Sequence, residues 1–185
     1  MKNWILLLGM LAGGCAVGAG LSGIGAGHYV QTECPWASYA IFEARDAIGG
    51  TWDLFRYPGI RSDSDMHTLG FGWKPWKGKK AIADGADIRS YLQEAAAENG
   101  IDRRIRYHHK VVEADFSTED ARWTVTVERT DTGERSQLTA SFLWSTSGYY
   151  RYDEGFTPDF EGVEDYQGQL VHPQHWPEDL DYQGK

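Results

Sequence analysis

The segment Gly18-Ala19-Gly20-Leu21-Ser22-Gly23 has the glycine spacing of a loop that binds the diphosphate of a dinucleotide. In such a loop the first glycine permits a tight turn, and the second lets backbone N–H groups approach the diphosphate. The third glycine allows the following helix to pack close to the sheet, so that the anion lies at the positive end of that helix. The surrounding sequence is rich in glycine, where this pattern also arises by chance, so its context decides what it predicts.

Glu43 supplies that context, because it follows Gly23 by twenty residues at the end of the apolar run 39–42. The run is typical of a buried strand. A carboxylate at the end of such a strand accepts hydrogen bonds from a ribose. The alternative is an ordinary solvated carboxylate at a strand end, and the distance from the glycine loop favours the ribose site.

Two further segments have residue types suited to a ligand site. The turn Gly49-Gly50-Thr51-Trp52 has glycines that allow a close approach of the backbone to a ligand. The loop 56–65 follows directly and places two arginines and two aspartates around Pro58-Gly59. This loop is either a solvated cluster of ion pairs or part of the site, and its position after the glycine turn favours the site.

Composition narrows the class of protein. A chain of 185 residues is long enough for one sizeable domain. With 18 basic and 27 acidic residues its formal net charge is −9, which argues against a nucleic-acid partner. Cys15 and Cys34 are too few and too poorly spaced for a metal site or a disulfide framework, so we expect no metal and two free thiols in a reducing compartment.

The N-terminus allows two interpretations. Residues 4–27 contain no charged side chain, which is typical of a signal peptide or a glycine-rich membrane helix, and membrane contact would then occur through this stretch. The glycine loop instead requires a buried strand before it, and parallel sheets do contain continuous apolar strands. Residues 11–17 include two adjacent glycines, so the expected first strand is damaged or displaced.

The remaining elements predict an α/β fold. Residues 21–33 and 84–99 are expected to be helices, and residues 38–43 the second strand. Alternating residues over 105–143 predict a small antiparallel meander, and 142–148 reads as a strand that runs into a glycine turn. We therefore expect a Rossmann-like parallel sheet with flanking helices plus this meander. The expected regions are an apolar segment 1–17, a nucleotide-binding domain 18–150 and a linker 151–185.

From Gly18 to its C-terminus the chain resembles the N-terminal part of class B flavoprotein monooxygenases, the group of Baeyer–Villiger and flavin-containing monooxygenases. The resemblance rests on the glycine motifs, on Arg56-Tyr57-Pro58-Gly59 with Asp63, and on the segment 166–177. That segment is similar to the Baeyer–Villiger fingerprint FxGxxxHxxxW, in which Tyr166 replaces the phenylalanine while His172 and Trp176 match.

The resemblance implies FAD as a cofactor. It places the diphosphate at the glycine loop, the adenosine ribose at Glu43 with Ala44 and Arg45 nearby, and the adenine beside the backbone of Val112. Near the flavin end it implies Gly50, Thr51 and Trp52. It also implies Asp63 close to the flavin, and His172 and Trp176 on a linker that couples nicotinamide binding to domain motion.

The implied reaction is reduction of FAD by NADPH, capture of O₂ as a C4a-peroxyflavin, and transfer of one oxygen atom to a ketone or a soft nucleophile. In the family a second glycine-rich unit for NADPH follows the fingerprint, so the sequence is expected to be a fragment that is inactive alone. The alternatives are an N- or S-oxygenating flavin-containing monooxygenase, a non-catalytic flavin-binding remnant, or a membrane-tethered protein. The expected location is cytoplasmic, or membrane-associated through the apolar N-terminus.

Overall fold

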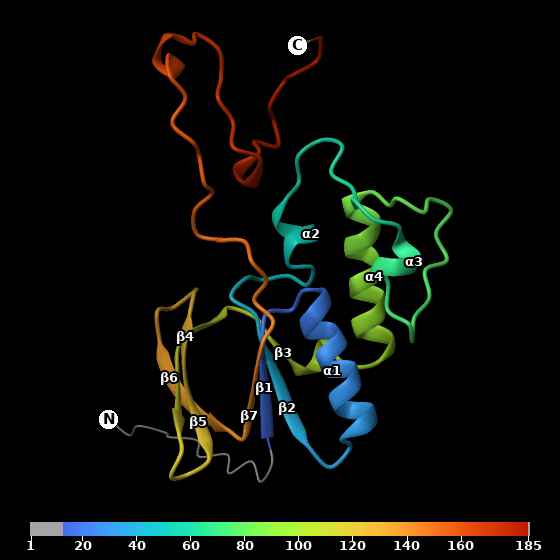
Figure 1. Cartoon of the computed structure of the whole chain (residues 1–185), viewed down its shortest axis with the longest axis vertical. Coiled ribbons are helices and arrows are strands. Elements are labelled where there is room, and N and C mark those ends of the chain that lie inside the picture. Colours follow the sequence, from blue (N-terminus) through green and yellow to red (C-terminus); the bar gives the residue numbers. More distant parts are fainter. Residues whose placement is uncertain (1–12, 185) are drawn as a thin grey trace.

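The computed structural model describes residues 13–184 and contains a four-stranded parallel sheet at its centre (Figure 1). Its strands lie in the order β3-β2-β1-β7. They comprise β1 (Gly13–Val17), β2 (Ser38–Phe42), β3 (Ile105–Arg106) and β7 (Phe142–Ser145).

The central strand β1 forms although it begins with two glycines. It pairs in parallel with β2 on one side and with β7 on the other, so that Gly14 lies opposite both Tyr39 and Phe142. A Cβ atom at Gly14 would lie 2.8 Å from the indole ring of Trp144. The glycine therefore makes room for that indole, and its poor intrinsic strand preference is outweighed by packing. The expectation of a damaged first strand is wrong for residues 13–17, and residues 1–12 lie outside the described part of the chain.

Helices cover one face of the parallel sheet (Figure 1). Helix α1 (Leu21–Glu33) and helix α4 (Gly85–Glu98) place Ile24, Ile88 and Leu92 in a fully buried core against the sheet. Burial of apolar surface of this kind is the dominant stabilising contribution to such a layer. Both helices were expected from the sequence, and the structure confirms them to within one residue at each end.

The antiparallel sheet β4-β5-β6 covers the opposite face (Figure 1). Val125 and Val127 pack there with Phe42 and Cys15 in a second core cluster. Burial raises the pKa of the Cys15 thiol to about 11, so that it stays protonated at neutral pH. The strands are β4 (His109–Ser117), β5 (Arg122–Arg129) and β6 (Arg135–Ala140). The predicted meander is thus confirmed for β4, β5 and β6, whereas β3 at the start of the predicted range and β7 at its end belong to the parallel sheet.

Two single-turn helices, α2 (Thr51–Leu54) and α3 (Met66–Leu69), lie in the connection between β2 and α4. The aromatic residues of this connection pack on α4, where the hydroxyl of Tyr91 accepts from the backbone N–H of Phe71 and donates to the carbonyl of Lys74. The connection thereby lies fixed on the helical layer rather than free in solvent.

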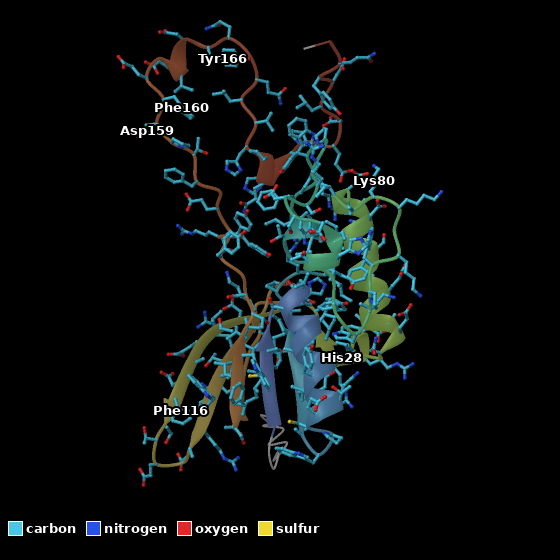
Figure 2. The ribbon with its side chains drawn as sticks, turned by 45° about the vertical axis from the view of Figure 1, so that its right-hand side comes forward. His28, Lys80, Phe116, Asp159, Phe160 and Tyr166 are labelled. Carbon is cyan, nitrogen blue, oxygen red and sulfur yellow. The ribbon has the colours of Figure 1, made fainter. Side chains whose placement is uncertain are left out.

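Residues 149–184, which we call the strap, extend away from the rest of the described chain, residues 13–148, which we call the body (Figure 1). The only regular elements within the described part of the strap are two 3₁₀ turns, Val163–Asp165 and Pro173–His175. Phe160 and Tyr166 are more than half exposed and lie on its part far from the body (Figure 2). The described part of the strap is therefore irregular, and its role as a linker stays a prediction.

The apolar N-terminal stretch is only partly described. Residues 13–17 belong to β1, and residues 21–27 form the first half of α1. Over residues 13–184, no helix combines the length and the apolar character needed to cross a membrane.

Candidate functional site

The loop between β1 and α1 has the geometry that its glycine spacing predicts. Gly18 has a φ of +103°, which side chains rarely adopt, and its N–H donates to the carbonyl of Phe42 at 2.8 Å. A Cβ atom at Gly18 would lie 2.8 Å from the carbonyl oxygen of Thr146. A Cβ atom at Gly23 would lie 1.9 Å from the carbonyl oxygen of Gly18, so only glycine lets α1 pack this close to the loop.

The N-terminus of α1 faces this loop with its backbone uncovered. Gly20 is the N-cap residue of the helix, and no side chain caps it. The first N–H groups of a helix have no partner within the helix and carry partial positive charge, so an anion such as a diphosphate is stabilised there. The missing side chain at Gly20 leaves space for the anion to reach these groups.

Glu43 lies at the end of β2, where its side chain is only 4% exposed. One carboxylate oxygen accepts from the N–H of Ala19 at 2.7 Å, and the other accepts from the N–H of Arg45 at 3.0 Å. These two bonds fix the carboxylate at the edge of the glycine loop. A carboxylate has about four acceptor positions, so both oxygens can still accept from the hydroxyl groups of a ribose.

The second glycine turn lies against the first. Gly49 has a φ of +137° and donates its N–H to the carbonyl of Ala19 at 3.1 Å. A Cβ atom at Gly50 would lie 3.1 Å from the Cα atom of Gly20. The two loops thus approach each other backbone to backbone, and helix α2 begins at Thr51 directly after the contact.

These segments enclose a cavity of about 400 Å³. Its rim is formed by both glycine turns, the end of β2, the start of β4 and the first residues of the strap. Nine of the predicted site residues line it, namely Gly18, Gly20, Leu21, Ser22, Glu43, Ala44, Gly50, Thr51 and Trp52. A cradle of backbone beside a buried carboxylate fits the diphosphate and ribose of a dinucleotide.

Other predicted residues lie elsewhere. The guanidinium of Arg45 pairs with the carboxylate of Asp53 rather than facing the cavity. Val112 is 40% exposed at a bulge of β4 between Val111 and Glu113, and it does not line the cavity, whereas its neighbour Val111 does. Asp63 is exposed and does not line the cavity.

The structure adds residues that the sequence pattern did not single out. Thr146 lines the cavity and donates its hydroxyl to the carbonyl of Val17 at 2.7 Å, which places the turn after β7 over the glycine loop. Tyr152 of the strap also lines the cavity, and burial raises the pKa of its phenol while a hydrogen bond with Thr51 lowers it in part. The sequence did predict a glycine turn after the strand at 142–148, but it held no signal for Tyr152.

The fingerprint residues lie on the strap, away from this cavity. The Nδ1 atom of His172 accepts from the N–H of Gln174 at 3.1 Å, so the ring proton belongs on Nε2, which donates to the carbonyl of Phe156 at 3.3 Å. Trp176 lines a second hollow of about 340 Å³ together with Arg56 and Glu178. His172 therefore orders the strap itself, while Trp176 faces the segment that follows the second glycine turn.

Fold and site together define a dinucleotide-binding unit of Rossmann type. The family described as NAD(P)-binding Rossmann-like domain matches residues 17–78. The chain is 60% identical over 169 residues to the FAD-containing monooxygenase EthA of Mycolicibacterium smegmatis, an alignment that covers 91% of this chain and 34% of that protein. The chain thus spans about a third of the length of this relative.

Solved structures agree with this relationship. An oxidized steroid monooxygenase bound to NADP superposes with a TM-score of 0.75 at 30% identity, over 92% of this chain and 32% of that chain. OTEMO in complex with FAD and NADP superposes with a TM-score of 0.76 at 26% identity, over 95% of this chain and 33% of that chain. The chain belongs to the class B flavoprotein monooxygenases and corresponds to their N-terminal, FAD-binding part. FAD and NADP are the cofactors of this family.

Proposed function

We propose that this chain forms the FAD site of an NADPH-dependent monooxygenase that inserts one atom of O₂ into a small organic ketone. The observation that carries the proposal is the cradle of Gly18, Gly20 and Gly50 beside the buried carboxylate of Glu43. The relationship to proteins named FAD-containing monooxygenase supports the choice of FAD over another dinucleotide.

The chain's own residues bind and orient the dinucleotide. The N-terminus of α1 stabilises the diphosphate charge through its free N–H groups. Glu43 accepts from the adenosine ribose, and its existing bonds to the N–H groups of Ala19 and Arg45 hold its charge in place. Thr51 and Trp52, at the start of α2, line the flavin side of the cavity, and Tyr152 covers it from the strap. Bound FAD supplies the redox chemistry with NADPH and O₂.

Ketones are the favoured substrates because the strap resembles the Baeyer–Villiger fingerprint through His172 and Trp176. The likeness to the closed structure of a cyclohexanone monooxygenase, with 25% identity and a TM-score of 0.71, supports the same choice. In this proposal the strap, whose fold depends on His172 and Gln174, links the FAD site to the part of the enzyme that binds NADPH.

Titration of the purified chain with FAD tests the first step. We expect quenching of flavin fluorescence and protein-bound flavin absorbance bands at one FAD per chain. The matched control is Gly18→Val, which places a side chain against the carbonyl of Thr146, and it is expected to abolish binding. A folded wild-type chain that stays colourless would contradict the proposal.

Anaerobic addition of NADPH tests the second step. We expect that the 185-residue chain alone does not bleach bound FAD, and that a full-length relative carrying the same FAD site does. Among residues 13–184 the glycine-rich loop after β1 is used for FAD, which leaves NADPH to another part of the enzyme. Bleaching by the isolated chain would overturn this division, and oxidation of sulfides but no ketone by the full-length relative would overturn the substrate class.

A further inference from the structure

Asp53 is the charged side chain most completely buried beside the glycine turns. Its side chain is 3% exposed, and three arginines surround it. One carboxylate oxygen lies 2.5 Å from Nη2 of Arg45. The other lies 3.0 Å from Nη2 of Arg56 and 3.3 Å from Nη1 of Arg89. No residue-level expectation from the sequence included this cluster.

A buried carboxylate with three guanidinium partners is costly to assemble unless its position is needed or its pairing is complete. Here the pairing joins three separate segments. Arg45 follows β2, and Arg89 lies in α4. Asp53 lies in α2, and Arg56 follows two residues after the end of that helix. The single carboxylate therefore holds the short helix α2 between the sheet and the helical layer, where a four-residue helix has little stability of its own.

The same cluster contacts the second glycine turn directly. A Cβ atom at Gly49 would lie 2.9 Å from the Cβ atom of Asp53 and 3.4 Å from Cγ of Arg89. Arg45 also donates to the carbonyl of Gly50 at 3.5 Å. The N–H of Asp53 donates in turn to that carbonyl at 3.1 Å. The turn is thus fixed from its outer side by the ion cluster, while its inner side faces Gly20 and the cavity.

We propose that Asp53 is a positioning residue for the flavin site: through Arg45, Arg56 and Arg89 it holds the Gly49–Gly50 turn at the distance from Gly20 at which the dinucleotide fits. Asp53 does not line the cavity. Its effect on FAD rests on the proposed function, whereas its effect on the turn does not.

The experiment compares Asp53→Asn and Asp53→Glu with the wild-type chain. Amide hydrogen exchange of residues 46–56 is measured without FAD. The N–H groups of Gly49, Trp52 and Asp53 form backbone hydrogen bonds in the turn, so their exchange rates show how often the turn opens. FAD affinity is measured by flavin fluorescence, well below the unfolding temperature of each variant. Asp65→Asn is the matched control, because that carboxylate caps the short helix α3 and lies outside the cavity.

We expect Asp53→Asn to speed exchange in residues 46–56 selectively and to weaken FAD binding by about tenfold to a hundredfold, the scale of the loss of one charge-assisted hydrogen bond. Asp53→Glu keeps the charge and should recover part of both. Asp65→Asn should change neither. If Asp53→Asn fails to fold, Arg89→Gln removes one partner only and should give the same selective exchange with a smaller loss of affinity.

Two results would overturn the proposal. In the first, residues 46–56 of Asp53→Asn or Arg89→Gln exchange their amide hydrogens at the same rate as in the wild-type chain. The other is faster exchange spread evenly over the body with FAD affinity reduced only in proportion to the unfolded fraction, which marks a purely structural role. A wild-type chain that binds no FAD would refute the proposed function, and the exchange data would still decide whether Asp53 holds the turn.

Discussion

The body and the strap meet beside the nucleotide cavity, and different contacts hold each in shape. In the body, backbone groups of separate segments touch directly, as where the N–H of Gly49 bonds to the carbonyl of Ala19. In the strap the backbone–backbone bonds stay within single turns, and side chains join separate segments, as where the amide of Gln174 donates to the carbonyls of Arg151 and Tyr152 at 2.9 and 3.0 Å. Backbone contacts leave little freedom to adjust, whereas side chains adjust by changing rotamer.

This difference decides what a small change of volume does in each region. A new methyl group that meets backbone in the body forces two secondary-structure elements apart. At Gly168 of the strap the same group meets the side chain of Tyr166, which can turn into solvent. Three substitution pairs test the comparison.

The largest effect is expected from Gly23→Ala in the body. Its Cβ atom would lie 1.9 Å from the carbonyl oxygen of Gly18, so α1 must move away from the loop. Overpacking of this kind costs about 1–3 kcal/mol, and the displaced helix should no longer bind FAD. Urea unfolding gives the stability, and flavin fluorescence gives the binding.

Gly168→Ala in the strap is the paired variant. Its Cβ atom would lie 2.2 Å from the ring of Tyr166, an overlap of similar size, but that ring is 59% exposed and free to turn. We expect a change in unfolding free energy below about 0.5 kcal/mol and unchanged FAD binding. Equal losses in the two variants would refute the proposed difference between the regions.

Glu43→Gln should have the second largest effect. The amide of glutamine has one acceptor oxygen, so its NH₂ group would face the N–H of Ala19 or of Arg45 and leave that donor unsatisfied. A buried unsatisfied group costs about 1–3 kcal/mol, and we expect FAD affinity to fall by about tenfold. Fluorescence titration measures it. Glu161→Gln, on the exposed strap, should bind FAD as the wild type does. An equal loss of FAD affinity in Glu161→Gln would show that the effect comes from the change in net charge.

The smallest effect is expected from Gln174→Ala. The variant loses the bonds to the carbonyls of Arg151 and Tyr152, each of which stabilises the strap by about 1 kcal/mol. We expect the strap to open locally, while the body keeps its stability. Cleavage by trypsin after Arg151, whose side chain is 76% exposed, should become about fivefold faster or more. Gln167→Ala is the control, and unchanged cleavage in both variants, or faster cleavage throughout the body, would contradict the role of Gln174.

Local sequence relationships predicted a large part of this molecule. The glycine spacing predicted the first loop, the apolar run 39–42 predicted β2, and alternating residues predicted the meander. Each of these signals acts over one element or one connection. The solvated-carboxylate alternative for Glu43 does not hold, because that side chain is buried and bonded to the loop.

What the sequence did not predict depends on distant or irregular pairing. Arg89 meets Asp53 across 36 positions, and no local pattern connects the two. Val112 lies at an irregular pairing, the bulge in β4, and stays outside the cavity that its neighbour Val111 lines. The two glycines of β1 predicted a weak strand. That prediction was wrong because Gly14 makes room for the indole of Trp144, which comes from the distant strand β7.

The hydroxyl of Thr146 bonds to a carbonyl 129 positions earlier in the chain, and β7 supplies one neighbour of the central strand. A polypeptide under synthesis therefore has its glycine loop long before it has the segment that completes the pocket around it. Contacts of such long range form late and slowly. The nascent chain gains a finished FAD site only after β7 has left the ribosome, so until then β1 offers an open edge to chaperones or to other chains.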